Sequence, residues 1–404
     1  MGYNARWYTD EGHLRSLGRG HLNRLLARYE KDLAEEGITI AQPEKDADFY
    51  RELAAVFMRP EGIPPALHEA LFHIEGLDTK GGFERIVDAV LSGKLKIDLQ
   101  EESSPADKVL QAWLQNERLV RQLYIEAGLD ASKSFVHFRA RGLIVPAMRE
   151  FAAVKAQLEE SLSRTFLARG RGEGCEVVPH PRGKEMIFVV YHGEPFRRET
   201  RRNGKALEPI FYWPNGQDLV VYNSQYRTLR MNVQARWLKT AYAQGFGEFV
   251  FGSLSLFQEE PLYTLEPLRE KGRLVLEGRA FGIGSIALVE LHTTVDEDAN
   301  DVRIRRADDV FWAYQKEAWL NGESEEPAEN AGSLLPDCEP LALAKFSLLF
   351  EGSKRKRLVS IEVPNRAKYT QDKDGVRVTE WLRESGISLA APVANADAEG
   401  TEGG

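Results

Sequence analysis

The chain has 404 residues, of which 43% are hydrophobic and 28% are charged, and its formal net charge at pH 7 is −9. This composition is typical of a globular protein with two or three domains, and the negative net charge argues against a protein that coats nucleic acid over its whole surface. No apolar run approaches the roughly 18 to 20 residues needed to cross a bilayer, and residues 1–20 lack the apolar core of a signal peptide. We therefore expect a cytoplasmic protein with no membrane partner.

The N-terminal third is dominated by helical patterns. From the spacing of apolar residues and the punctuation between them, helices are predicted at 13–36, 46–58, 64–75, 81–91 and 105–128. The last of these has a strong start signal, because Ser104 can cap it and Pro105 occupies the first helical position. Short connections between these helices predict a compact all-helical domain over residues 1–130.

The middle of the chain alternates short apolar runs with Gly, Pro and Asn turn signals, as a meandering antiparallel sheet does. An extended segment at 132–146 and a long helix at 147–167 precede it. The expected strands are 186–191, 209–213, 218–222, 228–233, 283–294 and 302–306. Helices at 236–252 and 307–316 and extended segments at 262–268 and 273–276 complete an α+β domain over 131–320.

The C-terminal part carries two more strands at 343–350 and 358–363 and a helix at 376–385, after a polar linker at 322–332. Residues 336–389 are predicted to form a small α/β unit, which either stands alone or completes the central sheet. Residues 390–404 are low in complexity and predicted to be disordered. The expected fold class is α+β, a helical N-terminal domain followed by a mainly antiparallel β-sheet domain with flanking helices.

Positive charge is concentrated in two short clusters that are candidate nucleic-acid-binding sites, since Arg and Lys on loops contact phosphates. The first cluster lies in the predicted loop between strands 186–191 and 209–213, and consists of Arg197, Arg198, Arg201, Arg202 and Lys205. The second lies in a predicted hairpin turn and consists of Lys354, Arg355, Lys356 and Arg357. Nearby rings can stack on bases or pack the sheet, namely Tyr212, Trp213, Tyr222 and Tyr226. For each cluster the alternative is a solvated turn.

The most enzyme-like segment is YHGEP at 191–195, where His192 can act as a general base and Glu194 can orient it. The arginines that follow can then hold a phosphate. Motifs for a serine nucleophile, a nucleotide-binding loop or a metal site fail on spacing; His68 and His73 are five positions apart, where a zinc-binding helix requires four. We expect no metal and no cofactor, and a small-molecule ligand is not indicated.

Three functions are consistent with these patterns. The first is a non-enzymatic nucleic-acid-binding subunit, with DNA as the expected ligand, of a bacterial cytoplasmic multi-protein complex active in antiviral genome defence. The defence role rests on the absence of catalytic motifs in a large chain and on no particular residue. The second is a metal-dependent phosphodiesterase or nuclease centred on His192 and Glu194. The third is a protein-interaction scaffold that contacts other protein subunits and no nucleic acid.

Overall fold

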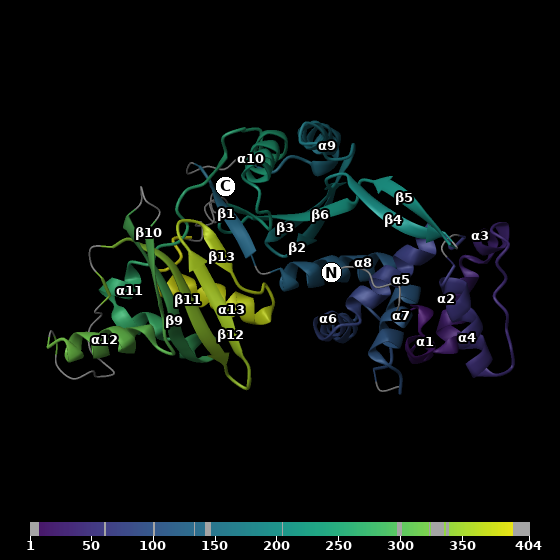
Figure 1. Ribbon diagram of the computed structural model, residues 1–404, viewed down its shortest axis with the longest axis horizontal. Helices are drawn as coiled ribbons and strands as arrows, with labels where there is room; N and C mark the ends of the chain where they lie inside the picture. Colours follow the sequence, from purple (N-terminus) through teal and green to yellow (C-terminus); the bar gives the residue numbers. More distant parts are fainter. Residues whose placement is uncertain are drawn as a thin grey trace, which may run out of the picture. The chain divides into compact units, whose positions relative to one another are not determined.

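The computed structural model describes residues 8–59, 62–99, 102–132, 134–141, 147–203, 205–296, 301–322, 324, 335–336 and 339–390. The chain divides into two compact units, Met1–Leu129 and Asp130–Gly404. Helices make up the first unit, and an antiparallel sheet with interspersed helices makes up the second (Figure 1). The fold is therefore α+β, as the sequence predicts.

The helices that precede the strands agree with the predictions at 46–58, 64–75 and 81–91 to within two residues at each end, and they are divided into shorter helices at 13–36 and 105–128. They are α1 (Glu11–Ser16), α2 (Arg19–Ala27), α3 (Glu30–Glu35), α4 (Asp46–Phe57), α5 (Pro65–Leu77), α6 (Lys80–Leu91), α7 (Pro105–Gln115) and α8 (Glu117–Ala131). The single helix predicted at 13–36 is wrong, because Leu17 adopts an extended conformation that ends α1. Asn116 interrupts 105–128 in the same way, and its side chain accepts a hydrogen bond from Leu119 N to start α8. The Ser104 cap is confirmed, since its hydroxyl accepts from Asp107 N.

One apolar core holds these helices together. It contains leucines at helical spacing in the sequence, such as Leu22 and Leu25, and it surrounds the fully buried Trp113. Burying a side chain of this size typically contributes about 1.5–3 kcal/mol. The amphipathic pattern of the sequence therefore identifies the core of this unit even where helix boundaries differ.

The second unit contains the strands. They are β1 (Ser134–Ala140), β2 (Cys175–Arg182), β3 (Glu185–Gly193), β4 (Arg197–Asn203), β5 (Ala206–Tyr212), β6 (Asn215–Asn223), β7 (Thr228–Met231), β8 (Phe257–Gln258), β9 (Ile283–Asp296), β10 (Asp301–Arg306), β11 (Leu341–Phe350), β12 (Lys356–Glu362) and β13 (Arg366–Lys368). Among the described residues, eleven strands form one sheet in the order β10-β9-β11-β12-β13-β1-β7-β6-β3-β2, with β8 paired to β1. All of its pairings are antiparallel, and segment 336–389 supplies β11, β12 and β13 to it.

Helices in this unit lie between the strands in sequence. They are α9 (Phe151–Leu167), α10 (Arg236–Gly245), the π-helix η2 (Phe246–Val250), α11 (Pro267–Glu270), the 3₁₀ helices η3 (Gly272–Leu276) and η4 (Arg279–Phe281), α12 (Val310–Leu320) and α13 (Lys373–Glu384). The extended segment predicted at 273–276 is wrong, because η3 occupies it. The predicted linker at 322–332 and tail at 390–404 lie, apart from residues 322, 324 and 390, outside the described residues.

The helices cover opposite faces of the two halves of this sheet. Val136 of β1 packs in one cluster with residues of α9 and α10, over the half that contains β2, β3, β6 and β7. The next residue toward the N-terminus, Phe135, points to the other face and lies opposite Ala367 of β13. Ala367 packs in a second cluster with Trp381 of α13, over the half that contains β9 to β13. The covered face therefore changes between β1 and β13.

Candidate nucleic-acid interface

The first predicted arginine cluster lies on a β-hairpin and not in a loop. Its four arginines belong to β4, which pairs with β5 in a separate two-stranded sheet, and Lys205 lies in the turn that joins them. The predicted loop, and with it the simple meander, is therefore wrong. Periodicity reveals strands that bury one face, and β4 (RRETRRN) has no apolar residue, so the alternation rule does not detect it.

The hairpin has two faces, because side chains alternate along a strand and directly opposed residues share a face. Arg198 lies opposite Phe211, and the ring of Phe211 lies 5.9 Å from that of Phe196. The aromatic-basic face, as we call it, consists of Phe196, Arg198, Arg202, Leu207, Phe211 and Trp213. The polar face, on the other side, consists of Arg197, Glu199, Arg201, Glu208, Ile210 and Tyr212.

Two groups of the polar face, Arg201 and Tyr212, interact with carboxylates of the hairpin. The Arg201 guanidinium donates from Nε to Oε2 of Glu208 at 3.0 Å. A hydrogen bond with the carboxylate of Glu199 raises the pKa of Tyr212. This face therefore carries acidic partners for Arg201 and Tyr212, whereas no described carboxylate forms an ion pair with Arg197.

The aromatic-basic face has no such compensation. In the described part of the chain, no carboxylate forms an ion pair with Arg198 or Arg202. The Arg198 guanidinium lies 6.0 Å from the Phe211 ring centroid, which is within the range of a cation–π contact. Phe211 and Trp213 are 56% and 55% exposed, although both are large apolar side chains. Exposed rings and unpaired arginines thus share one surface, and the hairpin extends away from the strands that it joins (Figure 1).

Two close backbone contacts hold the base of the hairpin against loop 169–174. A Cβ atom at Gly193 would lie 2.5 Å from Gly172 N, and one at Gly172 would lie 3.0 Å from Trp213 Cβ. Gly193 therefore cannot carry a side chain without a shift of the backbone, and a side chain at Gly172 would have to displace Trp213 slightly. The sequence predicts a plain connection for this glycine-rich loop, and its observed role is to let the backbone approach the hairpin and set the position of Trp213.

A polar network lies beneath this base. His192 is buried, with 1% of its side chain exposed, and its Nε2 lies 2.9 Å from Oδ2 of Asp218. The same carboxylate oxygen accepts a hydrogen bond of 2.7 Å from the Tyr242 hydroxyl. Burial disfavours the charged imidazolium, but hydrogen bonds with Asp218 and the Gly193 carbonyl outweigh it and raise the pKa of His192. The ring also stacks on Phe166 at 4.5 Å.

The partner of His192 differs from the predicted one. Glu194 forms an ion pair with Arg171 at 3.3 Å, and Asp218 orients His192. Both ring nitrogens are within hydrogen-bond distance of protein oxygens, Nδ1 with the Gly193 carbonyl and Nε2 with Asp218. Asp218 begins the strand-like run DLVVY. The one feature of the sequence that could have indicated its role is that a carboxylate occupies a core-facing position of a predicted strand.

The surroundings of His192 include one cysteine thiol. A cavity of about 720 Å³ opens beside His192 and is also lined by Cys175. Burial raises the pKa of that thiol to about 12, so it stays protonated at neutral pH and is a poor nucleophile. Within the described residues, no group of three or more His, Cys, Asp or Glu side chains is placed to hold a metal ion.

The second basic cluster is remote from the hairpin. Lys354 and Arg355 precede β12, while Arg357 within that strand is already paired with Asp372 at 2.5 Å and Asp374 at 2.8 Å. In the sheet order, β13, β1, β7 and β6 separate β12 from β3, so five steps of about 4.8 Å place the two strands roughly 24 Å apart. The structure does not bring the two clusters together.

The rings named from the sequence are also divided. Trp213 belongs to the aromatic-basic face and Tyr212 to the polar face, whereas Tyr222 packs in the core. Phe196 and Phe211 are functional candidates that the sequence reasoning missed. The sequence gives only a weak indication of either residue. Phe196 directly precedes the arginine run, and Phe211 is brought opposite Arg198 only by the register of the hairpin.

The chain matches no protein-family model and no curated protein. None of the described helices is both long and apolar enough to span a bilayer.

Proposed function

We propose that this chain is a non-enzymatic protein that binds single-stranded nucleic acid on the aromatic-basic face of the β4–β5 hairpin. One observation carries the proposal: exposed rings and unpaired arginines occupy one face, while acidic residues and their partners occupy the other. A hairpin that is merely solvated does not need its exposed rings and its acidic residues on separate faces. The two sides of the hairpin therefore have different tasks.

Single-strand binding requires both of these residue types. Bases stack on aromatic side chains, and each stack contributes about 1–3 kcal/mol, while arginines contact the phosphates. Arg198 and Arg202 are four residues apart on β4, which corresponds to about 13 Å, so they contact the phosphates of different nucleotides. A duplex hides its base faces from the rings of Phe211 and Trp213, and this favours a single strand as the ligand.

The remaining surface supports selective binding at this face. The chain has a net charge of −9, which repels nucleic acid from surfaces that lack a basic cluster. At the end of α12, Trp319 and Leu320 are 42% and 67% exposed, and exposed apolar groups of this kind are typical of contacts with protein partners. DNA as the ligand, a cytoplasmic location in a bacterium and a place in a multi-protein complex for genome defence belong to the same proposal.

Salt dependence of binding tests the arginines. Fluorescence anisotropy with a labelled single-stranded oligonucleotide, measured over a series of salt concentrations, gives the slope of log K against log [salt]. The double variant Arg198→Gln/Arg202→Gln is expected to lower the magnitude of that slope by about 1.4, since each lost phosphate contact in a single strand contributes about 0.7. The matched control is Arg197→Gln/Arg201→Gln on the polar face, which removes the same charge and should change the slope far less.

Stacking is tested on the same hairpin. Phe211→Ala is expected to weaken binding by about 1–3 kcal/mol at every salt concentration, without a change in slope. Tyr212→Ala, its neighbour on the polar face, is the control and should bind as the unmodified chain does. Equal losses from both faces would contradict the assignment, as would tighter binding to duplex than to single strands. Parallel DNA and RNA oligonucleotides identify the nucleic acid, and no binding to either would favour the protein-interaction scaffold.

A further inference from the structure

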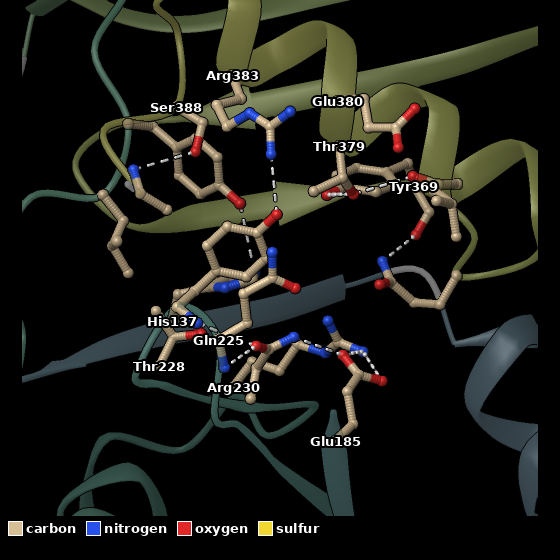
Figure 2. Close-up of a pocket in the computed structure, with 18 of the residues that line it drawn as sticks. His137, Glu185, Gln225, Thr228, Arg230, Tyr369, Thr379, Glu380, Arg383 and Ser388 are labelled. Atoms are coloured by element: carbon tan, nitrogen blue, oxygen red, sulfur yellow. Dashed lines mark hydrogen bonds and ion pairs between the residues drawn. The ribbon is translucent and has the colours of Figure 1, made fainter. Parts of the chain in front are cut away.

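A second cavity lies where the helices change from one face of the large sheet to the other. Its volume is about 380 Å³, within the range of small-molecule sites. In Figure 2, Thr379, Glu380 and Arg383 of α13 lie on one side, and Glu185, Arg230 and His137 lie on the other. The cavity exists because α13 covers β11 to β13 and not the neighbouring β1 and β7.

Three of the groups that line this cavity are polar but uncharged. Burial, helped by the nearby Arg230, lowers the pKa of His137 to about 3, so its imidazole is neutral at physiological pH. Burial raises the pKa of Tyr263 well above its ordinary value and also raises that of Tyr369, so both phenols keep their protons. A ligand beside these three side chains meets neutral hydroxyl and imidazole groups, next to the charge of Arg230.

The guanidinium groups around the cavity are already compensated. Arg182 pairs with Asp130 at 3.0 Å, Arg230 pairs with Glu185 at 2.9 Å, and Arg383 lies 3.5 Å from Glu384. A phosphate would therefore add repulsion from these carboxylates to any attraction by the arginines. This balance favours an uncharged ligand with many hydrogen-bonding groups.

One aromatic ring is held at the wall as a flat platform. The Tyr226 hydroxyl accepts a hydrogen bond of 2.9 Å from Nη1 of Arg383, and its backbone N donates to Asn223 Oδ1 at 3.1 Å. Within the described part of the chain, Tyr226 stacks on no other ring. A ring that is held at its hydroxyl by Arg383 and stacks on no other described ring is suited to stacking on a planar ligand.

Two hydrogen-bonding side chains of the cavity, Gln371 and Glu380, further define the ligand that would fit it. Gln371 donates from Nε2 to the Tyr369 carbonyl at 3.2 Å, so its Oε1 remains as an acceptor for an amino group. No described residue forms an ion pair with Glu380, which lines the same wall, and a carboxylate in such a position can bind ribose hydroxyls. Together the platform, the amide and the carboxylate match a planar base joined to a sugar.

We propose that this cavity binds a ribonucleoside, with the base stacked on Tyr226, the base edge at Gln371 and the ribose hydroxyls at Glu380. The cavity shares no residue with the aromatic-basic face, so either proposal can fail without the other. The same chemistry is present in a free nucleoside and in a nucleotide at the end of a strand. Free nucleosides, nucleoside monophosphates and short oligonucleotides therefore form separate arms of the test.

Isothermal titration calorimetry of the full chain with adenosine, guanosine, cytidine and uridine is the experiment. At least one is expected to bind saturably at one site, its 2′-deoxy form to bind more weakly, and ribose alone not to bind. Its 5′-monophosphate should bind no more tightly. Absence of saturable binding by all four nucleosides would overturn the proposal, and a much tighter monophosphate would overturn the assignment of an uncharged ligand. If oligonucleotides bound and free nucleosides did not, the proposal that the ligand is a free nucleoside would likewise be overturned.

Substitutions of cavity residues test whether the nucleoside binds in this cavity. Tyr226→Leu is expected to lower affinity at least about fivefold, the lower end for loss of one base stack. Glu380→Gln, at an exposed position where folding is not at risk, should reduce the preference for ribose over deoxyribose. Arg377→Gln on the same helix but outside the cavity is the control, and Phe211→Ala on the hairpin should also leave nucleoside binding unchanged. Unchanged binding in both cavity variants would overturn the assignment to this cavity.

Discussion

The aromatic-basic face and the network around His192 contain similar residues in opposite settings. On the face, Arg198 and Arg202 form no ion pair with a described carboxylate, and the rings beside them are exposed. In the network, Arg171 is paired with Glu194, and His192 is buried against Asp218. A paired and buried charge stabilises the fold, whereas an unpaired and exposed one remains available for a ligand. Residues only a few positions apart in the sequence thus lie in different electrostatic settings.

The largest effect that tests this contrast is on stability. Asp218→Ala removes the shared acceptor of His192 and Tyr242, and loss of one member of a buried pair typically costs about 3 kcal/mol. Urea denaturation should therefore show a large drop in the free energy of unfolding. Nucleic-acid affinity under native conditions should change little, because the carboxylate lies off the proposed binding face.

An exposed pair provides the control for this variant. Glu208→Ala removes the partner of Arg201 on the polar face, where solvent screens the interaction, and should cost less than about 0.5 kcal/mol. If Asp218→Ala instead abolished binding while leaving unfolding unchanged, the network would be part of the interface and the contrast would fail.

A smaller effect concerns pH. The pKa of His192 is raised above its usual 6.5 in the folded protein, so its protonated form is stabilised there. The stabilisation is fully present below pH 6.5 and is lost as pH rises through the folded pKa. Asp218→Asn keeps the shape of the side chain but removes its charge. The difference in unfolding free energy between the unmodified chain and this variant should therefore shrink as pH rises.

Several titratable and charged groups surround His192 and influence its protonation. Arg171 opposes protonation of His192, Glu194 lies beside Arg171, and burial holds the pKa of Tyr242 well above its ordinary value. Urea unfolding of both proteins at several values between pH 5.5 and 8.5 is the measurement. A difference that grows with pH would mean that His192 is held neutral in the folded chain.

Much of the fold follows from sequence pattern because the pattern reflects burial. Short apolar runs identify β3, β6 and β7, since the consecutive central residues of β3 and β6 are all buried and Leu229 and Met231 of β7 pack in the core. The break at Asn116 is harder to predict, because one residue leaves helical geometry within a continuous amphipathic run. The change of covered face between β1 and β13 depends on the register of distant strands, and no local pattern records it.

The candidate site is less accessible to sequence reasoning for a related reason. Composition locates the arginines of β4, but their division into two faces depends on which β5 residue lies opposite each of them. Asp218 and Tyr242 are separated by 24 positions and meet on one oxygen only through tertiary packing. The cavity beside α13 likewise draws on residues from His137 to Arg383. Local sequence identifies chemical groups, and tertiary structure determines which of them are paired.

The smallest expected effect concerns the second basic cluster. The triple variant Lys354→Gln/Arg355→Gln/Lys356→Gln omits Arg357, which Asp372 and Asp374 hold in place. Exposed substitutions of this kind alter stability by no more than about 0.5 kcal/mol. Because the cluster is roughly 24 Å from β3, we expect the salt slope of oligonucleotide binding to stay that of the unmodified chain. A slope lowered by up to about 2, the value for three lost phosphate contacts, would instead extend the interface across the sheet to β12. Oligonucleotides of increasing length sharpen the measurement, since only a long strand can reach both clusters.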